Sequence, residues 1–379
     1  MAGIYIHIPF CRQICYYCDF HKSASLQLKD ELISALHREI ELQKNYLDND
    51  IIDTIYFGGG TPSIYSPKEI LVLIDQIKLY FNVNPKAEIT LEANPDDLDD
   101  EYLLRLSKTP VNRLSIGCQS FIDRDLVFLN RRHTAQQAQE SVKKAIGSGF
   151  SNISIDLIYG IPNFSVADLK RNIKIAVELN VQHISAYHLT IEEKTVFYKR
   201  RQKGDLKEIS EEESNNQFQV LIQDLAENGF EQYEISNFAR NGNYSIHNTN
   251  YWKQVKYLGI GPSAHSYNTS SRQWNINNNK TYISEIRKEK IPFQIENLNR
   301  KTQYNDFILS SLRTTWGINL SVLEEQHSKE MKDYCMSMAE KYIIYGLLAI
   351  KNNSLILTDQ GKFVSDNVIS ELLFVDADQ

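Results

Sequence analysis

Residues 4–229 alternate short apolar runs with amphipathic stretches, six of each. The apolar runs are continuous over several residues, as expected for parallel strands that are covered on both faces. Six successive strand–helix units predict an α/β protein with a right-handed parallel sheet, either open and doubly wound or a partial barrel. We expect strands at 4–8, 52–57, 88–92, 113–118, 153–159 and 183–189, and helices near 29–46, 67–81, 99–108, 134–149, 167–180 and 211–229.

The pattern changes after residue 232. The next segment is rich in Asn, Tyr and Ser, and we expect it to form an irregular extension packed on the sheet. From residue 298 on, three helical runs precede a short hairpin and a last helix, which suggests a mainly helical, winged-helix-like domain. The predicted domains comprise residues 1–232, 233–297 and 298–379.

Charge and hydropathy limit the classes of protein to which the chain can belong. The 41 Lys and Arg residues against 48 Asp and Glu give a net charge of −7, whereas duplex-binding proteins more often show a basic excess. We therefore expect no nucleic-acid partner. No run of about 18 apolar residues predicts a membrane span, and the N-terminus does not resemble a secretory signal peptide. We expect a cytoplasmic protein with reduced thiols.

Three of the five cysteines lie directly after the first expected strand, at Cys11, Cys15 and Cys18. Such tightly spaced thiolates favour zinc or an iron–sulfur cluster. Structural zinc sites and ordinary [4Fe–4S] clusters have four protein ligands, but the other two cysteines lie far along the chain. Three thiolates would leave one iron of a [4Fe–4S] cluster open. A zinc site completed by His7 or His21 is the alternative, and a disulfide is a weaker one.

The CxxxCxxC spacing resembles the hallmark of the radical S-adenosylmethionine (SAM) superfamily, and Tyr17 matches the aromatic position before the third cysteine. In that superfamily the open iron is chelated by the amino and carboxylate groups of SAM, and electron transfer cleaves SAM to a 5′-deoxyadenosyl radical. The resemblance implies a partial (β/α)6 barrel that holds a [4Fe–4S] cluster and SAM. The chemistry would lie at the carboxyl ends of the strands.

Glycines and charged residues fall at those strand ends. The run Gly58-Gly59-Gly60 would let the backbone approach a ligand closely, although a tight turn would need the same residues. Glu92 ends the third expected strand, where it could equally be a helix-capping acid. Asp156 lies between apolar neighbours in the fifth strand, and there an unpaired charge would be costly. It could instead be half of a buried ion pair.

A closer resemblance, to the oxygen-independent coproporphyrinogen III oxidase family, extends over the whole chain. It rests on motifs such as YIHIPFC, FGGGTP, LEANPDD and NRRH. We infer that Glu92 binds the ammonium group of SAM, Arg131 the carboxylate, and Gln119 with Asp156 the ribose. By this resemblance the SAM-contacting positions are Tyr5, Gly59, Gly60, Thr61, Glu92, Gln119, Arg131 and Asp156.

Two groups within that family, the oxidases and the heme chaperones, differ in sequence. The oxidases carry a further cysteine two residues after the third and a longer segment before the cluster, whereas this chain has Phe20 and an early cluster. The segment from His247 to Trp252 matches the HNxxYW motif that is tied to heme binding in the heme-chaperone group. From the residues alone, this segment could also be ordinary core packing. The candidate heme residues are His247, Asn248, Tyr251 and Trp252.

We therefore expect a heme chaperone that binds heme and transfers it to acceptor hemoproteins with the help of the cluster and SAM. It would lack coproporphyrinogen oxidase activity, and no residue is assigned as catalytic. The alternative function is oxidative decarboxylation of coproporphyrinogen III to protoporphyrinogen IX. Membrane-associated respiratory enzymes are candidate acceptors, and a homodimer is compatible with the resemblance. We expect the acidic C-terminal domain to be a lid or docking domain rather than a DNA reader.

Overall fold

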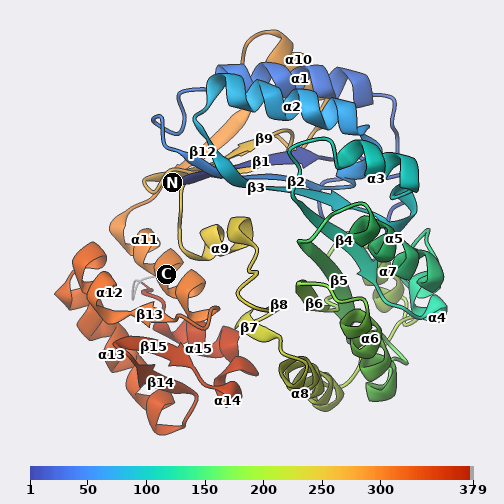
Figure 1. Cartoon of the computed structure of the whole chain (residues 1–379). Coiled ribbons are helices and arrows are strands. Elements are labelled where there is room, and N and C mark those ends of the chain that lie inside the picture. The colour runs from blue at the N-terminus through green and yellow to red at the C-terminus, as the bar shows by residue number, and fades with distance from the viewer. Residues whose placement is uncertain (376–379) are drawn as a thin grey trace.

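The computed structural model describes residues 1–375 (Figure 1). Its centre is a twelve-stranded sheet in which six parallel strands follow one another in chain order. The sheet curls into an arch, which confirms the predicted α/β fold with a partial barrel. The six strands are β1 (Ala2–Ile8), β2 (Ile52–Gly59), β3 (Val83–Ala93), β4 (Arg113–Gln119), β5 (Ile153–Tyr159) and β6 (His183–His188).

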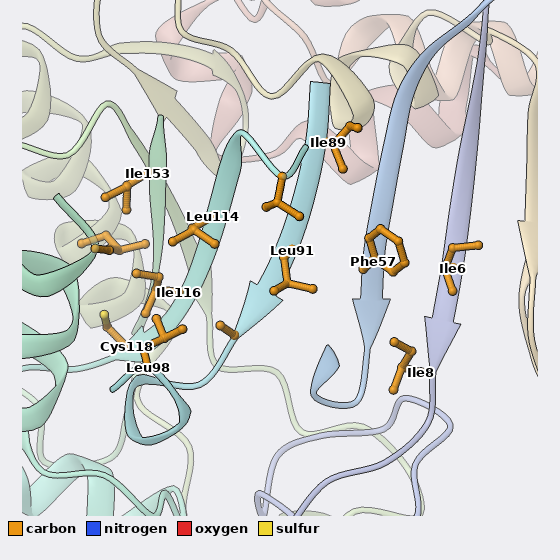
Figure 2. Close-up of a cluster of buried hydrophobic side chains, with 14 of the residues drawn as sticks. Ile6, Ile8, Phe57, Ile89, Leu91, Leu98, Leu114, Ile116, Cys118 and Ile153 are labelled. Atoms are coloured by element: carbon orange, nitrogen blue, oxygen red, sulfur yellow. The ribbon is translucent and has the colours of Figure 1, made fainter. Parts of the chain in front are cut away.

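Helices cover the outer, convex face of these strands (Figure 1), and several of them begin at capping boxes, such as those of Ser66, Thr134 and Ser165. Apolar side chains such as Ile6 and Leu91 fill the core beneath the helices (Figure 2). The helices are α1 (Lys29–Leu42), α2 (Pro67–Tyr80), α3 (Asp100–Leu106), α4 (Asp123–Phe128), α5 (Ala135–Gly147), α6 (Val166–Glu178), α7 (Val196–Gln202) and α8 (Glu211–Glu227), with short 3-10 turns at Pro62–Ile64 and Pro95–Asp97.

Residues 233–297 are more regular than their composition suggests, because they extend the sheet at both edges. In β11 the polar residues Ser271, Gln273 and Asn275 are buried, and the residues between them are less so. This alternation marks a strand, but buried polar side chains conceal it from a hydropathy pattern. The added elements are β7 (Glu231–Glu234), β8 (Asn237–Ala239), α9 (Ile246–Trp252), β9 (Tyr257–Ile260), β10 (His265–Tyr267), β11 (Ser271–Asn275), α10 (Asn279–Arg287) and β12 (Phe293–Asn297).

The C-terminal part has its own apolar core and a separate three-stranded sheet. The predicted order of helices, hairpin and last helix is confirmed, and the hairpin turns at Asn352 and Asn353, both with positive φ. Its elements are α11 (Arg300–Leu312), β13 (Ile318–Asn319), α12 (Leu320–His327), α13 (Lys329–Ile344), β14 (Leu348–Lys351), β15 (Ser354–Leu357), α14 (Asp359–Lys362) and α15 (Ser365–Leu372). Throughout residues 1–375, no helix combines the length and the apolar character needed to cross a membrane.

One buried carboxylate joins the added edge of the sheet to α1. Glu39 is fully buried and accepts hydrogen bonds from the Gly261 amide (2.7 Å), the Asn275 side chain (2.6 Å) and the Tyr282 hydroxyl. Its burial raises the pKa of Glu39 to about 7, against the lowering effect of these donors. The three donors come from the loop after β9, from β11 and from α10. Glu39 therefore holds this polar segment against the main core.

We expect Glu39→Ala to lower the midpoint of thermal unfolding substantially, because each buried donor that loses its acceptor costs about 1–3 kcal/mol. Asp30→Ala is the matched control, since Asp30 is exposed in the first turn of the same helix and its charge there is worth about 1 kcal/mol or less. Differential scanning calorimetry measures both variants. A midpoint for Glu39→Ala equal to that of the control would contradict this account.

Candidate functional site

The three clustered cysteines lie on the loop that follows β1. Cys11 is buried, Cys15 and Cys18 are half-buried, and all three are free thiols. The loop is fixed by a hydrogen bond from the Cys11 amide to the Ser23 carbonyl (3.0 Å). Burial raises the pKa of Cys11 to about 11, so its thiolate needs a positive partner. Three free thiols on one ordered loop fit the donor set of an iron–sulfur cluster.

Arg131 joins this loop to the ends of the neighbouring strands. Its guanidinium donates to Cys15 Sγ (3.2 Å), to the Asn94 side chain (2.7 Å) and to the Gly117 carbonyl (2.7 Å). Its Nε atom is buried and has no hydrogen-bond partner. A cation with a spare buried donor beside the cysteines can bind an anionic ligand, such as a carboxylate.

The glycine run at the end of β2 packs directly beneath the cysteine loop. The Gly60 amide donates to the Ile8 carbonyl (2.7 Å), and a Cβ atom on Gly60 would lie 2.6 Å from the Phe10 carbonyl oxygen. Gly59 has φ +109°, and a Cβ atom there would collide with the His7 ring. These glycines are therefore required for the loop to approach the strand. Thr61, which follows them, is buried and bonds to the Cys11 thiol.

Glu92 lies on the inner face of the arch at the end of β3. It accepts hydrogen bonds from the Tyr56 hydroxyl (2.8 Å) and the Gly59 amide (3.2 Å). Burial raises the pKa of Glu92 to about 7, and the nearby Asp156 adds to this effect. A buried carboxylate that is costly to ionise gains free energy when a cationic group binds beside it. An ammonium group is such a cation.

Asp156 and Gln119 lie on the same inner face. Asp156 bonds to Ser185 and Ser115, and its burial raises its pKa to about 6. Gln119 ends β4 with φ +67°, in the left-handed region that residues other than glycine rarely adopt. Such backbone strain concentrates at ligand-binding positions. The eight residues that resemble SAM contacts thus come from β1 to β5, the turn after β2 and the loop beyond β4, with Tyr5 and Asp156 in the middle of their strands.

Tyr5 and His7 also face the inside of the arch, and they bear on the zinc alternative. His7 bonds to the Tyr5 hydroxyl through Nδ1 (3.1 Å) and to the His21 carbonyl through Nε2 (3.2 Å). Both of its ring nitrogens are therefore already used. Within residues 1–375, no three His, Cys, Asp or Glu side chains converge on one point where a single metal ion could be held, as a zinc site requires. A [4Fe–4S] cluster instead takes its thiolates at separate irons.

The HNxxYW segment forms α9, which lies inside the arch (Figure 1). His247 is 2% exposed and stacks on Tyr56, with ring centroids 5.0 Å apart. Its Nδ1 bonds to the Thr54 hydroxyl (2.8 Å) and its Nε2 to the Tyr251 hydroxyl (2.9 Å). His247 is thus directed at the sheet, and Tyr251 bonds to it, while Asn248, Tyr251 and Trp252 are all half-buried.

Sequence reasoning missed the charges that hold α9 in place. Glu88 accepts hydrogen bonds from the amides of Ile246 (3.1 Å) and His247 (3.0 Å), and so satisfies the first turn of the helix. Arg113, only 1% exposed, lies 3.9 Å from Glu88. The sequence did contain a signal for this contact. Glu88 and Arg113 each lie in an expected strand, and a buried charge needs a partner.

Comparison with known proteins separates the strand–helix part of the chain from the C-terminal part, as the structure does. Residues 5–176 match the model of the radical SAM superfamily, and residues 298–364 match that of the HemN C-terminal domain. The chain is 34% identical to the heme chaperone HemW of Bacillus subtilis (98% of this chain, 99% of that protein). It is 33% identical to HemW of Mycobacterium tuberculosis, strain H37Rv (98% and 94%). The chain belongs to the family of HemW-like radical SAM proteins.

A solved structure shows the same fold as this HemW-like chain. Coproporphyrinogen III oxidase (HemN) from Escherichia coli, a radical SAM enzyme, superimposes with a TM-score of 0.85 at 23% identity. The match covers 98% of this chain and 90% of the oxidase. At this identity the likeness extends to the fold, including the C-terminal domain. Radical SAM membership implies a [4Fe–4S] cluster and SAM as cofactors.

The Glu92 carboxylate provides a direct test of the SAM pocket. We expect Glu92→Gln to weaken SAM binding about ten- to a hundredfold, since a hydrogen bond to a charged group is worth about 1.5–3 kcal/mol. Glutamine can still accept from Tyr56 but not also from the Gly59 amide, so the iron content should not change and thermal stability should fall only slightly. Equilibrium binding to cluster-reconstituted protein under anaerobic conditions measures this affinity. Glu140→Gln, on the exposed face of α5, is the control, and equal affinities of the two variants would contradict the assignment.

Proposed function

We propose that this protein is a cytoplasmic heme chaperone that binds heme and delivers it to acceptor hemoproteins. The observation that carries the proposal is the likeness, over 98% of the chain, to proteins named heme chaperone HemW. Five cysteines without a disulfide are suited to a reducing compartment. Phe20, whose side chain is 66% exposed, stands where the related oxidases are expected to carry a further cysteine. This departure favours the chaperone over the oxidase.

The cofactors would be held at the carboxyl ends of the strands. We propose that Cys11, Cys15 and Cys18 bind a [4Fe–4S] cluster with one open iron. SAM would lie beside it, with its ammonium at Glu92, its carboxylate at Arg131 and its ribose near Gln119 and Asp156. Tyr5, Gly59, Gly60 and Thr61 would complete the pocket. When bound, the cluster and SAM together supply one-electron chemistry.

The heme-binding segment would be α9. The geometry of His247 supports a positioning role, because both ring nitrogens are hydrogen bonded and the ring is stacked on Tyr56. Tyr251 shares that role, since its hydroxyl bonds to His247. Asn248 and Trp252, which are half-buried on the same helix, would then meet the heme.

The same contacts offer a route by which SAM could control heme. Glu92 accepts from the Tyr56 hydroxyl, and the Tyr56 ring stacks on His247 of α9. A cation that binds Glu92 would favour the charged form of this carboxylate, which is the acceptor of the Tyr56 hydroxyl. We propose that SAM binding shifts α9 and so gates heme binding or transfer, rather than serving porphyrin decarboxylation.

A heme titration and an oxidase assay on one reconstituted sample separate the two functions. We expect stoichiometric binding of hemin, followed by its Soret absorption. With dithionite, SAM and coproporphyrinogen III under anaerobic conditions, we expect no loss of the two propionates. The double variant His247→Ala/Trp252→Ala should lose heme affinity, because it removes both the anchor of α9 and its aromatic contact. Robust decarboxylation by the wild-type protein would overturn the proposal in favour of the oxidase.

A further inference from the structure

Arg113 is a buried cation whose hydrogen-bond donors are unused. It is the first residue of β4 and is only 1% exposed. Its Nε atom has no hydrogen-bond partner, and within residues 1–375 its two terminal nitrogens donate no hydrogen bond either. A guanidinium carries five N–H groups, and buried polar groups are nearly always paired. Arg113 is therefore a buried charge that no hydrogen bond fixes in one position.

The Arg113 side chain lies on the inner face of the arch, among carboxylates. Successive side chains of a strand alternate between its two faces, so Arg113 shares a face with Ser115, which bonds to Asp156. The register of β3 and β4 places Glu88 and Glu92 on that face as well. Among residues 1–375, Glu88 is the one carboxylate with which Arg113 forms an ion pair, at 3.9 Å.

The charge of Arg113 acts on three carboxylates that have different tasks. Glu88 accepts hydrogen bonds from two amides in the first turn of α9. Glu92 is the residue that we assign to the ammonium group of SAM. Burial raises the pKa of both Glu92 and Asp156, and the charge of Arg113 opposes this rise. One cation thus supports both the start of the heme-binding helix and the carboxylates of the SAM pocket.

We propose that Arg113 is a positioning residue that couples the SAM pocket to α9. Without SAM, its charge is divided between Glu88 and the pair of Glu92 and Asp156. An ammonium group at Glu92 repels the guanidinium and takes over the compensation of that carboxylate, so Arg113 moves closer to Glu88. The closer ion pair fixes the Glu88 carboxylate and, with it, the first turn of α9. The inference rests on the proposed function and adds a residue through which SAM acts on the heme-binding helix.

Hydrogen–deuterium exchange of α9, followed by mass spectrometry on the cluster-reconstituted protein, tests this coupling. At saturating SAM the amides of α9 should exchange severalfold more slowly than without SAM, because a firmer first turn lowers the population of the opened helix. Glu88→Gln should abolish this difference, since a neutral amide does not attract the guanidinium. Glutamine keeps one of the two acceptor oxygens, so α9 should exchange faster in this variant both with and without SAM. The effect of SAM is therefore compared within each protein.

Two further variants separate coupling from structural support. Arg113→Lys keeps the positive charge and should retain a slowing of exchange by SAM, and loss of this response would overturn the role assigned to the charge. Glu101→Gln is the matched control, because it removes an exposed carboxylate that pairs with Arg105 on α3, and it should respond to SAM as the wild-type protein does. A residue that only supports the fold would change the exchange of α9 equally with and without SAM.

The outcomes separate this inference from the function on which it rests. If SAM changes the spectrum of the cluster but leaves the exchange of α9 unchanged in the wild-type protein, the coupling is wrong, and the chaperone proposal stands or falls by the hemin titration. If Glu88→Gln keeps the wild-type response, the route through Arg113 is wrong, and internal water alone satisfies its donors. If the wild-type protein binds no SAM, the assignment of Glu92 fails and the inference fails with it.

Discussion

The contact between the glycine turn after β2 and the cysteine loop after β1 is the constraint on which the site depends. Gly60 bonds to the Ile8 carbonyl, and its Cα approaches the Phe10 backbone so closely that no side chain fits. This contact fixes the loop that carries the three thiols relative to the strand ends. Arg131 ties the same loop to the end of β4 through Cys15 and Gly117. A cluster site and a pocket for its partner ligand are thereby built against one edge of the sheet.

The inner face of the arch carries buried carboxylates whose ionisation costs free energy, and this cost indicates where a ligand would bind. Burial raises the pKa values of Glu92 to about 7 and of Asp156 to about 6, which means that their charged forms are poorly compensated in the protein alone. The nearby charges of Arg113 and Glu88 instead form an ion pair. Glu92 and Asp156, whose charged forms are only partly compensated, indicate a ligand site on this inner face, whereas Glu88 and Arg113 support the start of α9.

Much of this architecture could be predicted because it depends on local patterns. Continuous apolar runs identified the parallel strands, and the spacing of Cys11, Cys15 and Cys18 identified the cysteine loop. The strands of residues 233–297 were missed because polar residues such as Gln273 and Asn275 are buried in them. The geometry of His247 could not be predicted either, since its partners Thr54 and Tyr56 lie almost two hundred residues earlier.

The central claim is that three thiolates hold an iron–sulfur cluster whose open iron binds SAM. Electron paramagnetic resonance of the reduced, anaerobically reconstituted protein, recorded before and after addition of SAM, tests it most directly. The account predicts a [4Fe–4S] signal whose g values shift when SAM is added. A protein that binds no iron, or an iron signal that SAM leaves unchanged, would contradict it.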